Sequence, residues 1–222
     1  MSEFEEPDPI SFHDLPDDAR EALSFLGGHL AGLIRFDGEH VPIKVVIGPC
    51  GRMIAPVMVA MLRSLDCTIF LPEEPTETED EAIQVQVDLE QFEENGPDGA
   101  LADRWRIYHG EPPDVNWAIL NIDAAKYRDL FLTGEALELP NPLASEEAAI
   151  CKDINGGHEA DLKAAVIGEV ELEIEKPRLV GIDPLGFDVR GRFDVVRMPS
   201  PRIMMSGDDA RACLEEIFAR HR

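Results

Sequence analysis

The sequence predicts an α+β protein in which short strands come first and a small helix–hairpin–helix unit comes last. Between Val41 and Ile122, short segments rich in β-branched residues alternate with turns rich in Gly, Pro and acidic residues. Strands at this spacing are typical of a barrel or a sandwich. After Ser145 the apolar residues recur with helical spacing, and a hairpin and a capped helix follow. A chain of 222 residues has room for one large domain or two small ones.

The first predicted element is a helix that begins near Pro16. Asp17 and Asp18 suit the positive end of a helix, and Gly27-Gly28 predicts its end. Residues 1–12 are expected to form a loose arm.

The central part of the chain is predicted to be mainly strands. The clearest one alternates Ile83, Val85 and Val87 with polar residues, the pattern of a half-buried strand. Trp105 and Trp117 are expected to be core aromatics. The predicted strands span residues 41–48, 52–62, 67–74, 82–92, 105–110 and 116–122, and a short helix is predicted at residues 124–132.

Pro140 and Pro142 indicate a linker, after which Ser145 is the expected N-cap of a long helix. This predicts one domain over residues 1–143 and a second over residues 144–222. Gly156 and Gly157 interrupt the apolar stripe of that helix, which predicts either close approach by a neighbouring chain or ligand, or a real break. The stripe consists of Ile150, Ile154, His158, Leu162 and Val166.

The last third of the chain predicts a hairpin across Pro184-Leu185-Gly186, a further strand and a final helix. Asp183 stands where an Asp caps a turn of this type. Ser206 with Asp209 forms a plausible cap for the last helix.

The charge of the chain excludes several classes of partner. Asp and Glu number 45 against 20 Lys and Arg, a formal net charge of −25. Such a surface repels nucleic acids and anionic membranes. The acidic start is unlike a signal peptide and no apolar run is long enough for a membrane span, so a cytoplasmic location is expected. The basic tail from Lys176 to Arg222 is a candidate for docking on the acidic first part or for pairing two subunits.

Two stretches of the second part carry a family resemblance. The motif in the predicted helix is Asp153-Ile154-Asn155-Gly156-Gly157-His158, and the motif in the predicted hairpin is Gly181-Ile182-Asp183-Pro184-Leu185-Gly186-Phe187-Asp188. Together with Arg202 and the last helix, these motifs resemble the small C-terminal domain of the haem iron utilisation family. The first His and the Asp of the family's helix motif are replaced here by Asp153 and Gly157. The resemblance implies an FMN-binding-type split β-barrel of the pyridoxamine-phosphate oxidase kind, here degenerate, followed by the small α/β domain, and it implies a homodimer.

The resemblance also implies binding of haem or another tetrapyrrole in haem or iron handling, with or without turnover. His158 is the leading candidate for an axial ligand of haem iron, since an imidazole can bind iron or move a proton near neutrality. Asn155 and His221 are further candidates for the cofactor site, and His109 is another candidate ligand. The alternative is that His158 is a core histidine satisfied by Asn155 or by a backbone carbonyl.

Two other functions stay open. An FMN-dependent oxidoreductase needs positive groups and donors for the phosphate, for which Arg52, Arg63 and Ser64 are the candidates. The acidic loop from Leu71 to Glu81, which aligns with the family's phosphate loop, would repel that phosphate. The third hypothesis is a non-catalytic scaffold that acts through a protein partner. The four cysteines are far apart, without a CxxC, and are expected to be free, buried thiols.

Overall fold

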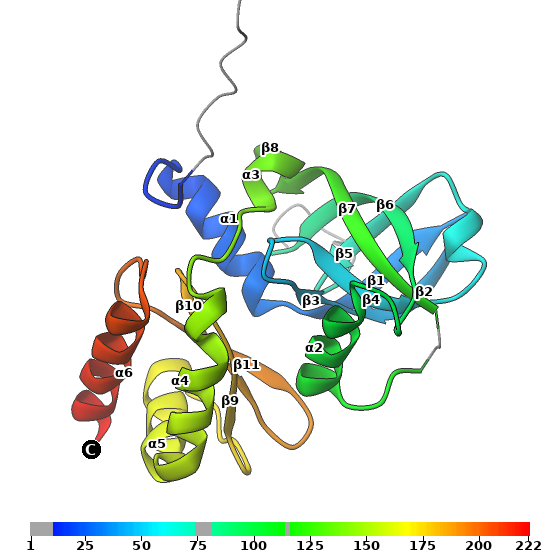
Figure 1. Ribbon diagram of the computed structural model, residues 1–222. Helices are drawn as coiled ribbons and strands as arrows, with labels where there is room; N and C mark the ends of the chain where they lie inside the picture. Colours follow the sequence, from blue (N-terminus) through cyan, green and yellow to red (C-terminus); the bar gives the residue numbers. More distant parts are fainter. Residues whose placement is uncertain (1–10, 74–80, 114–115) are drawn as a thin grey trace, which may run out of the picture.

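The computed structural model describes residues 11–73, 81–113 and 116–222 and shows a mixed α+β protein (Figure 1). The helices are α1 (Asp17–Gly28), η1 (Met61–Arg63, a 3-10 turn), α2 (Gly99–His109), α3 (Gly134–Leu137), α4 (Ala144–Gly157), α5 (Glu159–Val170) and α6 (Gly207–His221). The strands are β1 (Ala31–Phe36), β2 (Glu39–Lys44), β3 (Val46–Ile47), β4 (Met53–Val57), β5 (Cys67–Leu71), β6 (Ile83–Phe92), β7 (Asn116–Tyr127), β8 (Leu130–Thr133), β9 (Arg178–Asp183), β10 (Gly186–Arg190) and β11 (Val195–Pro199).

The first half of the chain builds one curled antiparallel sheet, in the order β2-β1-β5-β6-β7-β4-β3, with β8 beside β7. Its alternation follows the sequence, because Ile83, Val85 and Val87 are buried on β6 while the residues between them face outward or lie half-buried. This curled sheet is compatible with a split barrel. Helix α2 packs against β3 and β4.

The second half of the chain builds a smaller antiparallel sheet in the order β11-β10-β9. Helix α4 contacts β9, and α5 contacts both β9 and β11 (Figure 1). The buried residues form two hydrophobic clusters, one centred on each sheet. The boundary at residue 143 stays a prediction.

Several predicted elements are confirmed. Helix α1 follows Pro16, and the turn after β9 is capped because the Leu185 N–H donates to Asp183 Oδ1 over 2.8 Å. Ser206 caps α6 by accepting from the Asp209 N–H. Residues 1–10 of the predicted loose arm lie outside the described part of the chain. Phe12 is buried in the core, so the prediction of a loose arm is wrong at this residue.

Two central elements were predicted wrongly. Residues 105–110 belong to helix α2, although Trp, Ile and Tyr favour strands in isolation. Residues 124–132 continue β7 and turn into β8, because pairing with β6 and β8 outweighs the helix preference of the alanines.

The long helix of the second half also differs from the prediction. The structure begins α4 after Leu143, so Ser145 is not the N-cap. The predicted stripe is divided between α4, which ends at Gly157, and α5, which begins at Glu159. A Cβ placed on Gly156 or Gly157 would meet nothing within 4 Å, so these glycines mark a helix break and no close approach by a described residue.

The basic tail does not dock on the acidic first part through ion pairs within the described residues. Arg197 pairs with Asp183 and Asp188, Arg211 pairs with Asp153, and the other tail ion pairs likewise stay within residues 144–222. The ion pair that joins the halves has the opposite polarity, with Arg104 from the first half and Glu147 from the second.

Among the described residues, no helix combines the length and apolar character needed to cross a bilayer. The four cysteines are free, as predicted. Cys67 and Cys213 are also buried as expected, but Cys151 is only half-buried and Cys50 is exposed, so the burial prediction is wrong for Cys50.

Candidate functional site

Helix α2 presents two different faces, each made by a pair of residues four positions apart. Arg104 and Tyr108 form one pair, and Trp105 and His109 form the other. The first pair faces the small sheet and enters a buried polar network. The second pair lines an open groove on the large sheet.

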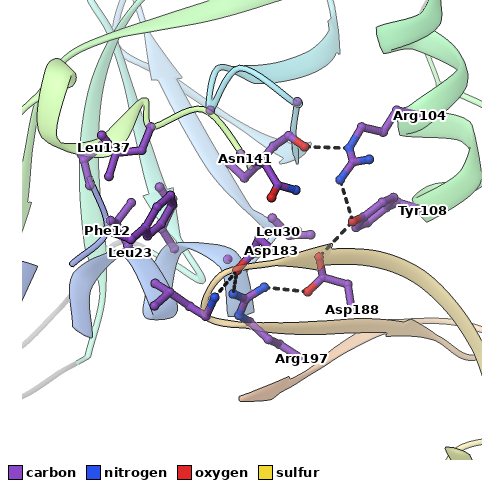
Figure 2. Close-up of a pocket in the computed structure, with 17 residues that line it drawn as sticks. Phe12, Leu23, Leu30, Arg104, Tyr108, Leu137, Asn141, Asp183, Asp188 and Arg197 are labelled. Atoms are coloured by element: carbon purple, nitrogen blue, oxygen red, sulfur yellow. Dashed lines mark hydrogen bonds and ion pairs between the residues drawn. The ribbon is translucent and has the colours of Figure 1, made fainter. Parts of the chain in front are cut away.

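The polar network joins the two halves of the chain (Figure 2). Arg104 binds both carboxylate oxygens of Glu147 on α4, at 2.5 and 3.0 Å, and donates from Nε to the Ile47 carbonyl at 2.8 Å. The Tyr108 hydroxyl donates to Asp188 Oδ2 on β10 at 2.9 Å. Bidentate arginine–carboxylate pairs of this kind fix geometry as well as supplying energy.

Arg197 on β11 completes the network from the other side. Its guanidinium donates to Asp183 Oδ1 at 2.6 Å and to Asp188 Oδ1 at 2.9 Å, and its side chain is 6% exposed. Its Nε is, among the described residues, the one buried side-chain nitrogen or oxygen without a hydrogen-bond partner.

Three glycines make room for this network. A Cβ on Gly181 would lie 1.7 Å from the Tyr108 hydroxyl oxygen, and a Cβ on Gly27 would lie 2.9 Å from the Arg197 guanidinium carbon. A Cβ on Gly186 would lie 3.1 Å from the same carbon. The hairpin motif of the sequence therefore has a structural explanation. Its glycines make room for the Tyr108 and Arg197 side chains, and its aspartates bind Arg197.

Burial controls the protonation of the network. Desolvation raises the pKa of Asp188, while the adjacent Arg197 lowers it, and desolvation together with Asp188 raises the pKa of Tyr108 well above its ordinary value. The adjoining cavity measures about 60 Å³, with Leu23, Leu26 and Leu30 among its walls. This volume accommodates a few water molecules but lies far below the several hundred cubic ångströms typical of cofactor sites.

The second face of α2 opens onto a larger groove, which we call the His109 groove. Its volume is about 400 Å³, within the range of small-molecule sites. Its walls are mainly apolar, and Lys44 and Glu111 supply charges. The lining residues are Val41, Pro42, Ile43, Lys44, Pro56, Met58, Met61, Trp105, His109, Glu111 and Pro113.

His109 is held in one defined tautomer. Its Nε2 lies 2.8 Å from the Val45 carbonyl, which can only accept, so Nε2 carries the proton and Nδ1 keeps a lone pair. Nδ1 has no hydrogen-bond partner among the described residues, and it is not sealed in the core, since the sole buried orphan there is Arg197 Nε. Desolvation lowers the pKa of His109 to about 4, with Lys44 and Arg190 acting in the same direction against the hydrogen bond to Val45. The imidazole is therefore neutral near pH 7.

The histidine favoured by the sequence lies elsewhere. His158 occupies the break between α4 and α5, with its side chain 45% exposed, its Nδ1 3.0 Å from Asp161 Oδ2 and its ring stacked on Phe218. It lines none of the four cavities described for this structure. Its expected core position with Asn155 is wrong, because the ring is exposed and its hydrogen-bonding partner is Asp161.

Asn155 binds a strand edge. Its side-chain nitrogen donates to the Leu179 carbonyl and its oxygen accepts from the Leu179 N–H, both at 2.8 Å. The backbone edge of β9 is thus satisfied by a side chain of α4, a device that blocks pairing with another strand. Asn155 and His158 do not contact one another through any hydrogen bond in the structure's described part.

The remaining predicted site residues are dispersed. His221 lies on α6, with Nε2 2.7 Å from Glu169 Oε1. Arg52 is half-buried between β3 and β4, and Arg63 is exposed on η1. The Ser64 hydroxyl donates to Asp37 at 3.0 Å, so this one of the predicted phosphate donors sits beside a carboxylate. Residues 74–80 of the acidic loop lie outside the described part of the chain.

These positions test how well each cofactor fits. A phosphate needs free donors and positive charge; the Ser64 hydroxyl is already engaged by Asp37, whereas Arg63 is exposed and forms no ion pair with a described carboxylate. Haem needs an apolar slot and a ligating side chain, and the His109 groove has mainly apolar walls and one imidazole. No cluster of three or more His, Cys, Asp or Glu suited to a bare metal ion occurs in the described residues.

Comparison with known proteins places the fold and leaves the function open. No protein-family profile matches the chain, and no curated protein sequence matches it. The crystal structure of a protein of unknown function from Agrobacterium tumefaciens is similar with a TM-score of 0.70 and 14% identity, covering 95% of this chain and 98% of that one. A haem-binding protein from Mycobacterium smegmatis gives a TM-score of 0.42 and 19% identity, covering 93% of this chain and 98% of that one. The fold is thus shared with a protein whose own function is unknown.

Proposed function

We propose that this protein binds haem or a related tetrapyrrole in the His109 groove. The observation that carries the proposal is a neutral imidazole with an uncommitted Nδ1 lone pair at the wall of an apolar groove of about 400 Å³. A neutral imidazole is the form that binds iron, and a hydrogen bond from its other nitrogen to a carbonyl or carboxylate is typical of metal-ligating histidines.

Each part of the groove has a role in this proposal. His109 would bind the haem iron, and the Val45 carbonyl fixes its tautomer and raises its basicity. Met58 and Met61 supply soft apolar contacts to the macrocycle. Lys44 is the cation for a propionate, while Glu111 disfavours a propionate on its own side. When bound, haem iron would supply the redox or oxygen chemistry.

The family resemblance adds further elements to the same proposal. These are the division at residue 143, the pairing of two copies, and a role in haem or iron handling with or without turnover. His158, Asn155 and His221 remain predicted cofactor residues, and His158 remains the predicted axial ligand on that basis. The imidazoles of His158 and His221 are each engaged by a carboxylate. His109 has no described partner at Nδ1, which favours His109 as the iron ligand.

An absorption titration with haemin tests the proposal. The wild-type protein is expected to give a saturable, shifted Soret band. His109→Ala should abolish the shift or weaken binding at least tenfold, while His158→Ala and His221→Ala should bind as the wild type does. Circular dichroism of His109→Ala checks that it folds, and His109→Gln, which can still donate to the Val45 carbonyl, removes the ligand with least disturbance.

Other outcomes would redirect the assignment. Loss of binding only in His158→Ala would transfer the axial role to the predicted residue. A flavin spectrum after titration with FMN, dependent on Arg52 or Arg63, would favour the oxidoreductase. No saturable change with either cofactor would contradict both, and would favour the non-catalytic scaffold.

A further inference from the structure

We propose that a second groove, between α2, α4 and the β9–β10 hairpin, binds a small organic anion with an apolar body. Arg178 and Arg190 would hold the anionic group. This groove shares no lining residue with the His109 groove, so the proposal stands independently of tetrapyrrole binding.

The two arginines are forced together by the sheet. Arg178 begins β9, Arg190 ends β10, and the antiparallel register places them directly opposite one another. Like charges at directly opposite positions repel and destabilise a strand pair. Both side chains line the same groove. An anion between them would turn this repulsion into attraction.

Neither arginine is neutralised by a carboxylate in the part of the chain that the structure describes. Arg178 is exposed and forms no ion pair with a described carboxylate, and Arg190 donates only to the Ile107 carbonyl, at 2.5 Å, in the last turn of α2. Most of the other arginines are paired in this chain, which has more than twice as many acidic as basic residues. Ion pairs with described carboxylates engage Arg20, Arg104, Arg106, Arg128, Arg192, Arg197, Arg202, Arg211, Arg220 and Arg222.

The carboxylates that line the groove are already engaged. Glu147 is bound by Arg104, and Asp103 lies 3.3 Å from Arg106. Burial raises the pKa of the Cys151 thiol to about 12, so this side chain adds no negative charge near pH 7. The positive charge at the mouth of the groove is therefore available to a ligand.

The shape of the groove selects the class of ligand. Its volume is about 500 Å³, and apolar groups from three elements line it, including Ile107, Ala148 and Val180. Guanidinium groups bind a carboxylate, sulfonate or phosphate oxygen pair in a planar fork. An anion with a short aliphatic or aromatic body satisfies both features, whereas a bare inorganic ion leaves the apolar wall uncovered.

A displacement experiment on the whole protein tests this site. The probe is 8-anilinonaphthalene-1-sulfonate, followed by fluorescence, with octanoate as the competing anion and octanol as its uncharged counterpart. Octanoate should displace a saturable fraction of the probe, and octanol should require at least a tenfold higher concentration. Arg178→Gln should weaken octanoate about tenfold, and the double variant with Arg190→Gln should lose saturable displacement.

The matched control is Arg192→Gln, which removes an exposed arginine already paired with Glu175 at 3.6 Å. It should leave octanoate binding unchanged. Because Arg178 makes no described ion pair or hydrogen bond, its variant is expected to fold normally, so a loss of binding reports on the site. Equal competition by octanol, or unchanged octanoate binding in Arg178→Gln, would overturn the proposal.

Discussion

The two faces of helix α2 differ in whether their polar atoms are already hydrogen-bonded or are available to a ligand. Arg104 and Tyr108 face the small sheet, and their donors are engaged by Glu147, Ile47 and Asp188. His109, one position beyond Tyr108, is held at one nitrogen only and keeps the other free. The same short helix thus contributes to a closed contact and to an open groove.

This difference teaches how to separate a structural polar cluster from a binding site. The network around Arg197 is more conspicuous, with several charges in one buried place, yet nearly every group has a partner and the cavity beside it is small. A buried, paired network specifies how elements pack. The His109 groove has fewer polar groups, but it has volume and an unused lone pair.

The largest expected effect comes from removing Arg197, which belongs to the buried polar network that the closed face of α2 enters. Arg197→Ala leaves Asp188 buried without its cation, and loss of one partner of a buried pair costs about 3–5 kcal/mol. Urea denaturation measures the free energy of unfolding. Arg192→Ala, which loses only an exposed pair, should cost about 0–1 kcal/mol. A loss below 1 kcal/mol for Arg197→Ala would mean that Asp188 does not depend on Arg197 as its buried partner.

His109, on the open face of α2, should make the free energy of unfolding depend on pH. The pKa of His109 falls from its ordinary 6.5 to about 4 on folding, so the unfolded chain takes up the proton first as the pH falls. The stabilisation is complete above about pH 6.5 and is lost toward pH 4, amounting to about 3 kcal/mol. Comparison of wild type with His109→Gln by urea denaturation at pH 7 and pH 4 isolates this part from the carboxylates. Equal pH dependence of the two proteins would show that His109 is not desolvated.

The smallest of the three effects tests the glycine that makes room for Tyr108. Gly181→Ala would place a Cβ 1.7 Å from the Tyr108 hydroxyl oxygen, and overpacking of this kind costs about 1–3 kcal/mol. Tyr108→Phe removes that oxygen, so the double variant should recover part of the loss. A double-mutant cycle of thermal unfolding measures the coupling, and strict additivity would show that the two residues do not meet.

The sequence was informative where local patterns decide the structure. The alternation in β6, the Asp183 turn and the Ser206 cap depend on neighbouring residues, and all three are confirmed. Helix α2 depends on tertiary packing, because Trp105 and Tyr108 are buried on different neighbours and outweigh the strand preference of their segment. Gly110, which has a φ of +84° just after the helix, was the local signal that could have predicted its end.

The site was harder to predict for the same reason. His158 stood out because it lies on an apparent apolar stripe, but the helix break at Gly157 turns it toward solvent and Asp161. His109 stood in a segment predicted as a strand, where it would share a face with Trp105 and Ile107. Only the helix places it beside Trp105, with its Nε2 against the carbonyl of Val45 between β2 and β3, in a groove that Met58 just after β4 also lines.

The most direct test of the account is a long-range proton–nitrogen NMR spectrum of the histidine side chains near pH 7. We expect His109 to be neutral, with the proton on Nε2, and its Nδ1 signal to shift when gallium protoporphyrin, a diamagnetic haem substitute, is added. The signals of His158 should stay unchanged. A protonated His109, or an Nδ1 signal that does not move while the porphyrin binds elsewhere, would contradict the account.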